Sequence, residues 1–248
     1  MAIDDRVTVI IPTSSVPSHP STRIIEQVLT SIDHHLPGAP IHILVDGLRP
    51  EYAHRHEQYA EYTRRLADVV PANTTIVVHS QHLHHAATIK LALEDIRTPL
   101  MLYCEHDMGI LLDRTVDWPL LAEAITSGKC DLVRLMLTET IHPLHMYLML
   151  GMIDGWPLMR NRQFSGWTHL ASVDFYRRLL APFDMRAKIM VERYAASIIE
   201  RSSWEQWKMT SYIPDPEASK RLFHLDGRTG DDGVRQPSYE ELEVYPPQ

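Results

Sequence analysis

The stretch Thr98-Pro-Leu-Met-Leu-Tyr-Cys-Glu-His-Asp-Met-Gly-Ile110 decides the fold of this chain. It is apolar from Pro99 to Cys104 and then changes abruptly to Glu105-His106-Asp107. A short, unbroken apolar run that follows a helical segment predicts a strand buried on both faces of a parallel sheet. We therefore expect the two acids at the carboxyl end of a central strand, where open α/β sheets bind their ligands.

Glu105 and Asp107 are spaced to share one ligand. Side chains at positions i and i+2 of an extended chain point to the same side, so both carboxylates can reach one hard cation or one ribose. The same spacing also occurs at solvated strand ends. Its place directly after a buried strand favours a site for a metal and a nucleotide.

The residues around this strand alternate between β-branched runs and amphipathic helical patterns. Before the acids we expect strands at 6–12, 41–45, 74–79 and 99–104, separated by helices from about 21, at 50–68 and at 82–96. This order predicts an α/β fold with a mostly parallel central sheet flanked by helices.

The pattern is less regular after residue 110. We expect helices at 118–127, 174–180 and 185–207, strands at 131–137, 146–152, 208–213 and 221–225, and an extended segment at 163–172. No shift in composition marks a linker. We therefore expect one domain over 1–230, with a nucleotide-binding lobe at about 1–110 and an acceptor lobe at 111–230, followed by a flexible acidic tail at 231–248.

Composition excludes several classes of protein. The net charge is −8 and no long basic run exists, which argues against a nucleic-acid binder. The longest apolar tract, 146–152, is too short to span a bilayer, and the first residues lack the apolar region of a signal peptide. Two cysteines form no disulfide framework, so we expect a cytoplasmic protein. The sequence does not determine the oligomeric state, and a homodimer is possible.

Two further polar positions follow strands of the same predicted sheet. Pro12-Thr13 ends the first strand and opens a loop rich in serine and proline, and Asp46 ends the second. An acid at that place can accept hydrogen bonds from a base or a ribose. The chain has neither the glycine-rich fingerprint of Rossmann dinucleotide sites nor that of P-loops.

Histidines offer a second possible metal site. His82, His84 and His85 resemble the paired imidazoles of zinc sites, and His142 and His145 form another pair. A zinc hydrolase built on the first cluster is therefore an alternative, although no H-E-x-x-H motif is present.

His224 stands apart from these clusters. It ends a late strand and precedes an Asp-Gly-Arg turn, so it can return to the central sheet edge. There it would complete a divalent-metal site, while Arg228 would neutralise a diphosphate.

Together these features resemble the nucleotide-sugar glycosyltransferases of the GT-A fold, nearest to the family-two-like branch. The resemblance rests on Pro12-Thr13, Asp46, the acid-x-Asp of 105–107, the Gly-centred segment 164–171, and Met190-Val-Glu192. It covers roughly residues 7–228. The chain departs from the family in reading Glu-His-Asp at the metal motif and in having a single Glu192, followed by Arg193, at the base position.

The resemblance implies a metal-dependent transfer of a sugar from a nucleoside-diphosphate sugar to an acceptor hydroxyl, with inversion of configuration. Asp107 would bind Mn²⁺ or Mg²⁺, Glu105 the ribose or the metal, and His224 would be a further ligand. The donor would also contact Pro12, Thr13, Asp46 and Arg228.

The resemblance places the acceptor, a small molecule or a glycan, in the second lobe. It would lie against Gly166 and Trp167, with Trp204 and Trp207 as further aromatic surfaces for a sugar. Glu192 would be the general base, with Asp174 and Glu205 as substitutes. A nucleotidyltransferase acting on a sugar phosphate is a further alternative, although the chain lacks its usual glycine-rich loop.

Overall fold

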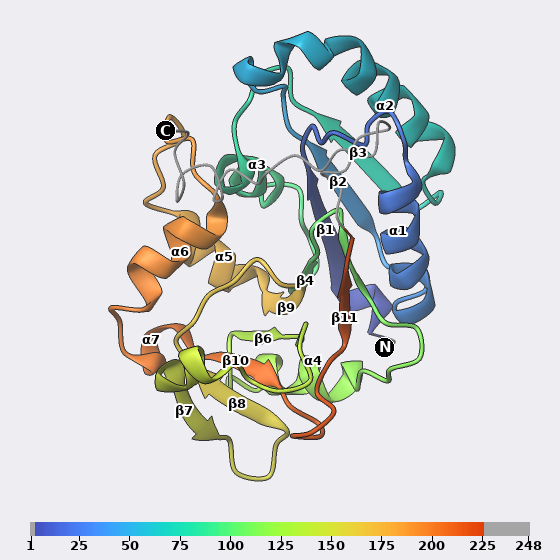
Figure 1. Ribbon diagram of the computed structural model, residues 1–248. Helices are drawn as coiled ribbons and strands as arrows, with labels where there is room; N and C mark the ends of the chain where they lie inside the picture. Colours follow the sequence, from blue (N-terminus) through green and yellow to red (C-terminus); the bar gives the residue numbers. More distant parts are fainter. Residues whose placement is uncertain (1–2, 226–248) are drawn as a thin grey trace.

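The computed structural model describes residues 3–225, which form a nine-stranded sheet with helices on both faces and a separate two-stranded sheet (Figure 1). The elements in chain order are η1 Asp4–Arg6, β1 Val7–Thr13, α1 Arg23–His35, β2 Ile41–Val45, η2 Pro50–Arg55, α2 His56–Val69, β3 Thr74–Val78, α3 His85–Ala92, β4 Leu100–Tyr103, β5 Met108–Ile110, α4 Trp118–Thr126, β6 Leu132–Arg134, η3 Pro143–Leu148, β7 Met149–Met152, β8 Leu158–Asn161, β9 His169–Ser172, α5 Val173–Leu180, α6 Val191–Ile199, α7 Trp204–Trp207, β10 Met209–Tyr212 and β11 Leu222–His224.

The first half of the chain forms the parallel part of the large sheet. Its strands lie in the order β3-β2-β1-β4, and every neighbouring pair is parallel. All residues of β1 and β4 are buried, as expected for strands covered on both faces. The carboxyl ends of these strands therefore meet at one edge.

The second half extends the same sheet in the order β9-β6-β10-β8-β7. β9 is antiparallel to both β4 and β6, β10 is parallel to β6, and β8 is antiparallel to β10 and β7. Within residues 3–225, only β8 and β9 run against the direction of the other strands of the large sheet. The prediction of a mostly parallel α/β sheet is confirmed.

Alternating residues of the central strands enter two separate cores. In β4, Leu100 and Leu102 pack with apolar residues of α1, α2 and α4, whereas Met101 and Tyr103 pack with those of α3, α5 and α6. Figure 1 shows α1 and α2 on one side of β1 and α3, α5 and α6 on the other. The site therefore lies between two packed layers, at the end of a strand held from both faces.

Two predicted helices are wrong in extent. The helix predicted at 82–96 begins only at His85, because His84 has a positive φ of 72° and its ring nitrogen accepts the His85 N–H. The helix predicted at 185–207 is two helices, α6 and α7. The segment before α6 is not helical and packs on α3, where the Ala86 N–H donates to the Ile189 carbonyl, and a capping box at Ser203 starts α7 separately.

The strand predicted at 146–152 is also too long. Pro143 starts a 3-10 helix that continues to Leu148, so only Met149–Met152 is extended. The short strands β5 and β8 were not predicted. The tail at 231–248 lies outside the described residues. No helix among residues 3–225 is long and apolar enough to cross a membrane.

Candidate active site

Asp107 lies just beyond β4, with a largely buried carboxylate. Its Oδ1 atom is buried and has no hydrogen-bond partner. Its Oδ2 atom lies 3.4 Å from Nε2 of His224. A buried carboxylate oxygen without a hydrogen-bond donor is destabilising unless a ligand completes it, so this atom is a candidate position for a ligand.

β11 brings His224 to this place from the far end of the described chain. It pairs with β5 so that His224 lies opposite Met108, and the Leu225 N–H donates to the Asp107 carbonyl at 2.7 Å. The Phe223 ring occupies the space where Gly109 lacks a side chain, so any larger residue at 109 would displace β11. The predicted return of His224 to the central edge is what the structure shows. Arg228 lies outside the described residues.

The charge state of Asp107 suits a cation. Burial raises the pKa of its carboxyl, but the neighbouring imidazoles of His106 and His224 more than offset this and hold the pKa below its ordinary value. A carboxylate and an imidazole are both ligands of Mn²⁺ and Mg²⁺-type sites. The two residues fit a divalent ion, although no group of three His, Cys, Asp or Glu side chains within residues 3–225 is arranged to hold a metal by itself.

The carboxylates of Glu105 and Glu192 both approach Gly166. A Cβ atom placed on Gly166 would lie 2.5 Å from Oε1 of Glu105 and 3.8 Å from Oε2 of Glu192. The Tyr103 hydroxyl donates to the same Glu105 oxygen at 3.0 Å, which limits how far that carboxylate can move. Glycine is therefore required at 166 by close packing. The strand end, the Gly-centred segment and the start of α6 meet as the resemblance implied.

The two substitute bases lie elsewhere. Asp174 is on the exposed face of α5, with 76% of its side chain accessible, and pairs with Arg178 one turn later. Glu205 is exposed in the first turn of the short helix α7. Of the three acids, Glu192 is the one that the structure places beside Gly166.

Asp46 is buried and serves the loop before α3. Its carboxylate accepts hydrogen bonds from the backbone N–H groups of Gly47, Leu83 and His84, and Nδ1 of His82 lies 2.7 Å away. Burial raises the pKa of Asp46, but the His82 contact and these N–H groups lower it by more. Asp46 therefore fixes the loop at this edge of the sheet.

These contacts also account for two of the clustered histidines. His82 faces Asp46, and His84 caps α3 through the His85 N–H. In His85 and His106, both buried, one ring nitrogen has no hydrogen-bond partner: Nδ1 in the first and Nε2 in the second. Burial, followed by the charge of His106, lowers the pKa of His85 to about 4, so its ring is neutral at pH 7.

Pro12 and Thr13 end β1 with buried side chains. The Thr13 hydroxyl lies 3.2 Å from the Tyr62 hydroxyl, so it belongs to the contact between β1 and α2. The Thr13 carbonyl accepts the Asp46 N–H. Their predicted contact with the donor stays a prediction.

These arrangements can be compared with known proteins. No family model and no curated protein matches the chain in sequence. Solved structures match in fold: GalNAc-T7 with UDP, GalNAc and Mn²⁺ has a TM-score of 0.56 and 11% identity over 89% of this chain. A mannosyltransferase of Pyrobaculum calidifontis in complex with GDP-Man and Mn²⁺ has a TM-score of 0.52 and 16% identity over 86%. TarS of S. aureus has a TM-score of 0.55 and 10% identity over 90% of this chain.

The chain has the GT-A glycosyltransferase fold. This confirms the resemblance at the level of fold. The matched part is 44% of the GalNAc-T7 chain, 55% of the mannosyltransferase chain and 61% of the TarS chain, so this chain spans about half the length of these neighbours.

On this GT-A fold, the tryptophans predicted to stack on sugars occupy different environments. Trp167 adjoins Gly166, and the guanidinium of Arg134 lies 5.0 Å from its ring centre. Trp204 donates from Nε1 to the Met209 carbonyl, and Trp207 packs edge-on against Phe175. Only the first of the three directly adjoins the residues brought together at the sheet edge.

Sequence reasoning missed the residues beneath the site. Arg134 at the end of β6 is buried and is close enough to Glu192 for that carboxylate to raise its pKa, although burial has the larger, opposite effect and lowers the pKa of Arg134 to about 10. His169 is buried, with ring nitrogens 2.7 Å from the Trp167 carbonyl and 2.6 Å from the Tyr176 hydroxyl. No local motif marks these residues.

Proposed function

We propose that this protein is a metal-dependent glycosyltransferase that moves a sugar from a nucleoside-diphosphate sugar to an acceptor hydroxyl with inversion of configuration. One observation carries the proposal: the carboxylates of Glu105 and Glu192 both approach Gly166, next to the strand end that carries Asp107. Inverting transfer needs one acidic region for the leaving diphosphate and its cation and a second acid for the acceptor proton.

Asp107 and His224 would hold the divalent ion, Mn²⁺ or Mg²⁺. The ion would neutralise the charge that develops on the departing nucleoside diphosphate. The unpartnered Oδ1 of Asp107 supports this assignment, as does the His224 ring 3.4 Å from the other oxygen. The neighbours crystallised with Mn²⁺ support a divalent ion in the same fold.

Donor binding would involve the carboxyl ends of β1, β2 and β4. Asp46 anchors the loop that carries His82 and His84, so this loop would form one wall of the donor site. Glu105 would accept a hydrogen bond from a ribose hydroxyl or contact the metal ion. Thr13, Pro12 and Arg228 are the other proposed donor contacts.

Glu192 would accept the proton of the acceptor hydroxyl. Oε2 of Glu192 would lie 3.8 Å from a Cβ atom at Gly166, so this carboxylate borders the Gly-centred segment that would bind the acceptor. Trp167 borders the same space and would offer a ring face to the acceptor.

Nucleotide release tests this function. The purified full chain is incubated with GDP-mannose and, separately, with UDP-GalNAc, with and without Mn²⁺, and free GDP or UDP is measured. Release of nucleotide that requires the metal and is stopped by EDTA supports the proposal. Binding of both donors without any release, to water or to a panel of sugar and polyol acceptors, would contradict it.

A further inference from the structure

Arg134 is a buried cation in the acceptor lobe. It lies at the end of β6 with 4% of its surface accessible. One terminal nitrogen lies 3.2 Å from the Ser165 hydroxyl, and the other donates to the Ser211 hydroxyl at 3.0 Å. The first also reaches the side-chain oxygen of Gln163 at 3.4 Å. The guanidinium thus joins the Gly-centred segment to β6 and β10.

Its position relative to two site residues is specific. The guanidinium carbon lies 5.0 Å from the centre of the Trp167 ring, and the Glu192 carboxylate interacts electrostatically with it. Its partners Ser165 and Trp167 are the chain neighbours of Gly166, which the carboxylates of Glu105 and Glu192 both approach. Arg134 therefore contacts the Gly-centred segment that would bind the acceptor, and it interacts electrostatically with Glu192, the proposed base.

Burial of the Arg134 charge costs free energy, so its presence calls for a structural or functional explanation. Removing an arginine from water is costly, and burial does lower the pKa of Arg134 to about 10. Its Nε atom is also buried without a hydrogen-bond partner. A well-packed apolar residue would tie β6 to β10 at lower cost, so tethering the strands does not by itself explain an arginine.

A second pair of the same kind lies outside the site. Arg160 on β8 has its guanidinium 5.7 Å from the Trp204 ring and also donates to the Leu150 carbonyl. It lies on β8 and contacts the ring of a tryptophan that belongs to α7, not to the Gly-centred segment. The two arginines therefore separate the effect of stacking on a tryptophan from the effect of position beside the base.

We propose that Arg134 is a positioning residue of the transfer reaction, which holds the Trp167 ring and the Glu192 carboxylate in a fixed relation on the acceptor side. This inference rests on the proposed glycosyltransferase function. The planar fork of arginine can bind two hydroxyls and lie against a ring at once, whereas lysine offers one compact charge. Arg134→Lys keeps the charge and loses that geometry.

The experiment compares four full-length variants with the wild type: Arg134→Met, Arg134→Lys, Ser211→Ala and the matched control Arg160→Met. Four quantities are measured: the melting temperature, its rise with GDP or UDP plus Mn²⁺, tryptophan emission, and kcat and KM for metal-dependent nucleotide release. Emission is also recorded for each arginine variant in a Trp167→Phe background.

We expect Arg134→Lys to lower kcat by about 10-fold to 100-fold, the scale of a small misplacement of reacting groups. KM for the donor and the nucleotide-induced rise in melting temperature should stay as in the wild type, because the donor groups do not contact Arg134. Ser211→Ala should lower kcat by less, in the same direction. Should Arg134→Met fail to fold, the lysine and Ser211 variants still decide the question.

The emission change on losing Arg134 should vanish in the Trp167→Phe background, whereas that of Arg160→Met should persist because it reports on Trp204. If Arg134→Lys and Ser211→Ala release nucleotide as fast as Arg160→Met, Arg134 only tethers strands and the inference is overturned. If the wild type releases no nucleotide from either donor, the proposed function fails, and this inference fails with it.

Discussion

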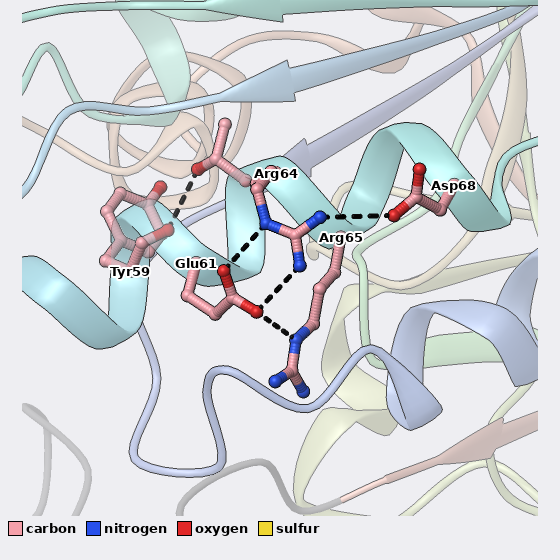
Figure 2. A network of polar contacts seen from close by, with 6 residues as sticks. Tyr59, Glu61, Arg64, Arg65 and Asp68 are labelled. Carbon is pink, nitrogen blue, oxygen red and sulfur yellow. Dashed lines mark hydrogen bonds and ion pairs between the residues drawn. The ribbon is translucent and has the colours of Figure 1, made fainter.

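The outer face of α2 and the active site both carry clusters of charge, but they are built in opposite ways. On α2, the two oxygens of Glu61 accept from Arg64 and Arg65, and Arg64 also reaches Asp68 (Figure 2). Each ion pair joins residues three or four positions apart, and the side chains are exposed apart from Glu61, which is half-exposed. Each charged side chain of this cluster therefore has an oppositely charged partner on the same helix.

At the site, the charged groups range from the buried Arg134, through the half-buried Asp107 and Glu192, to the exposed His224, and they come from segments far apart in the chain. Asp107 meets His224 from β11, and Glu192 of α6 lies near Arg134 of β6. Several buried polar atoms here have no hydrogen-bond partner, among them Oδ1 of Asp107, Nε2 of His106 and Nε of Arg134. The α2 charges pair with one another, whereas Asp107 keeps a buried oxygen without a hydrogen-bond donor, which is a candidate position for a ligand.

The largest expected effect is that of Glu192→Gln. The amide keeps the shape and the hydrogen bonding of the carboxylate but cannot accept a proton, so turnover should fall by about 10²–10⁴. Donor binding should change little, because the diphosphate is held at the other carboxylate region. The measurement is nucleotide release under saturating donor.

Asp174→Asn is the matched control, since it removes a carboxylate from an exposed face of α5. It should leave turnover unchanged. A loss in this variant, with full activity in Glu192→Gln, would show that the base is misassigned.

Asp46→Asn tests whether a buried acid carries structure as well as function. The amide would place an N–H against a backbone N–H of Leu83 or His84, so we expect a loss of about 3 kcal/mol in the free energy of unfolding. Chemical denaturation measures it.

The cost should depend on pH. Because the folded-state pKa of Asp46 is lowered, its ionised form contributes stability above the unfolded pKa of about 3.9, and this contribution is lost as the pH falls through the folded value. The difference between wild type and Asp46→Asn should therefore be constant from pH 7 to about pH 5 and shrink below about pH 4. A difference that grows in acid would contradict the assignment.

Gly166→Ala should separate function from stability. The new methyl group would meet Oε1 of Glu105 and force that carboxylate aside, so turnover should fall by about 10-fold to 100-fold. The displaced atom ends a side chain, so the melting temperature should change little.

Gly128→Ala gives the opposite pattern. Its methyl group would meet nothing within 4 Å, but the φ of 75° is strained for alanine and should cost about 1 kcal/mol of stability with activity intact. Equal losses of activity in the two variants would show that Gly166 acts through the fold alone.

Glu61→Gln should have the smallest effect. The hydrogen bonds of Arg64 and then Arg65 lower the pKa of Glu61 to about 2, but the group is exposed and screened by salt. We expect unchanged activity and a small fall in melting temperature that disappears in 0.5 M NaCl. A large, salt-independent fall would mean that the α2 network supports the fold.

The parallel half of the fold was predictable because its information is local. The apolar run of β4 and the β-branched runs before it each predict a strand from local sequence alone. Their alternation with helices then predicts a right-handed parallel arrangement. The prediction failed where a tertiary contact overrides the local pattern. Asp46 takes the N–H groups of Leu83 and His84 and so delays α3, which no pattern within 82–96 shows.

The site was predictable only as far as its motifs reach. Glu105, Gly166 and Glu192 were placed by resemblance, and the structure brings them together. Arg134 was missed because a lone arginine at a strand end has no distinguishing spacing. Its role depends on Ser165 and Ser211, which approach it only in the folded sheet.

Thermal stability measures most directly whether Asp107 is a metal ligand. A ligand that binds the folded state at 100 times its dissociation constant stabilises it by about 2.7 kcal/mol. GDP or UDP with Mn²⁺ should therefore raise the melting temperature of the wild type by several degrees, and neither nucleotide should do so in EDTA. Asp107→Asn should fold normally and lose the metal-dependent part of the shift. A variant that is stabilised by nucleotide and Mn²⁺ as strongly as the wild type would contradict the account.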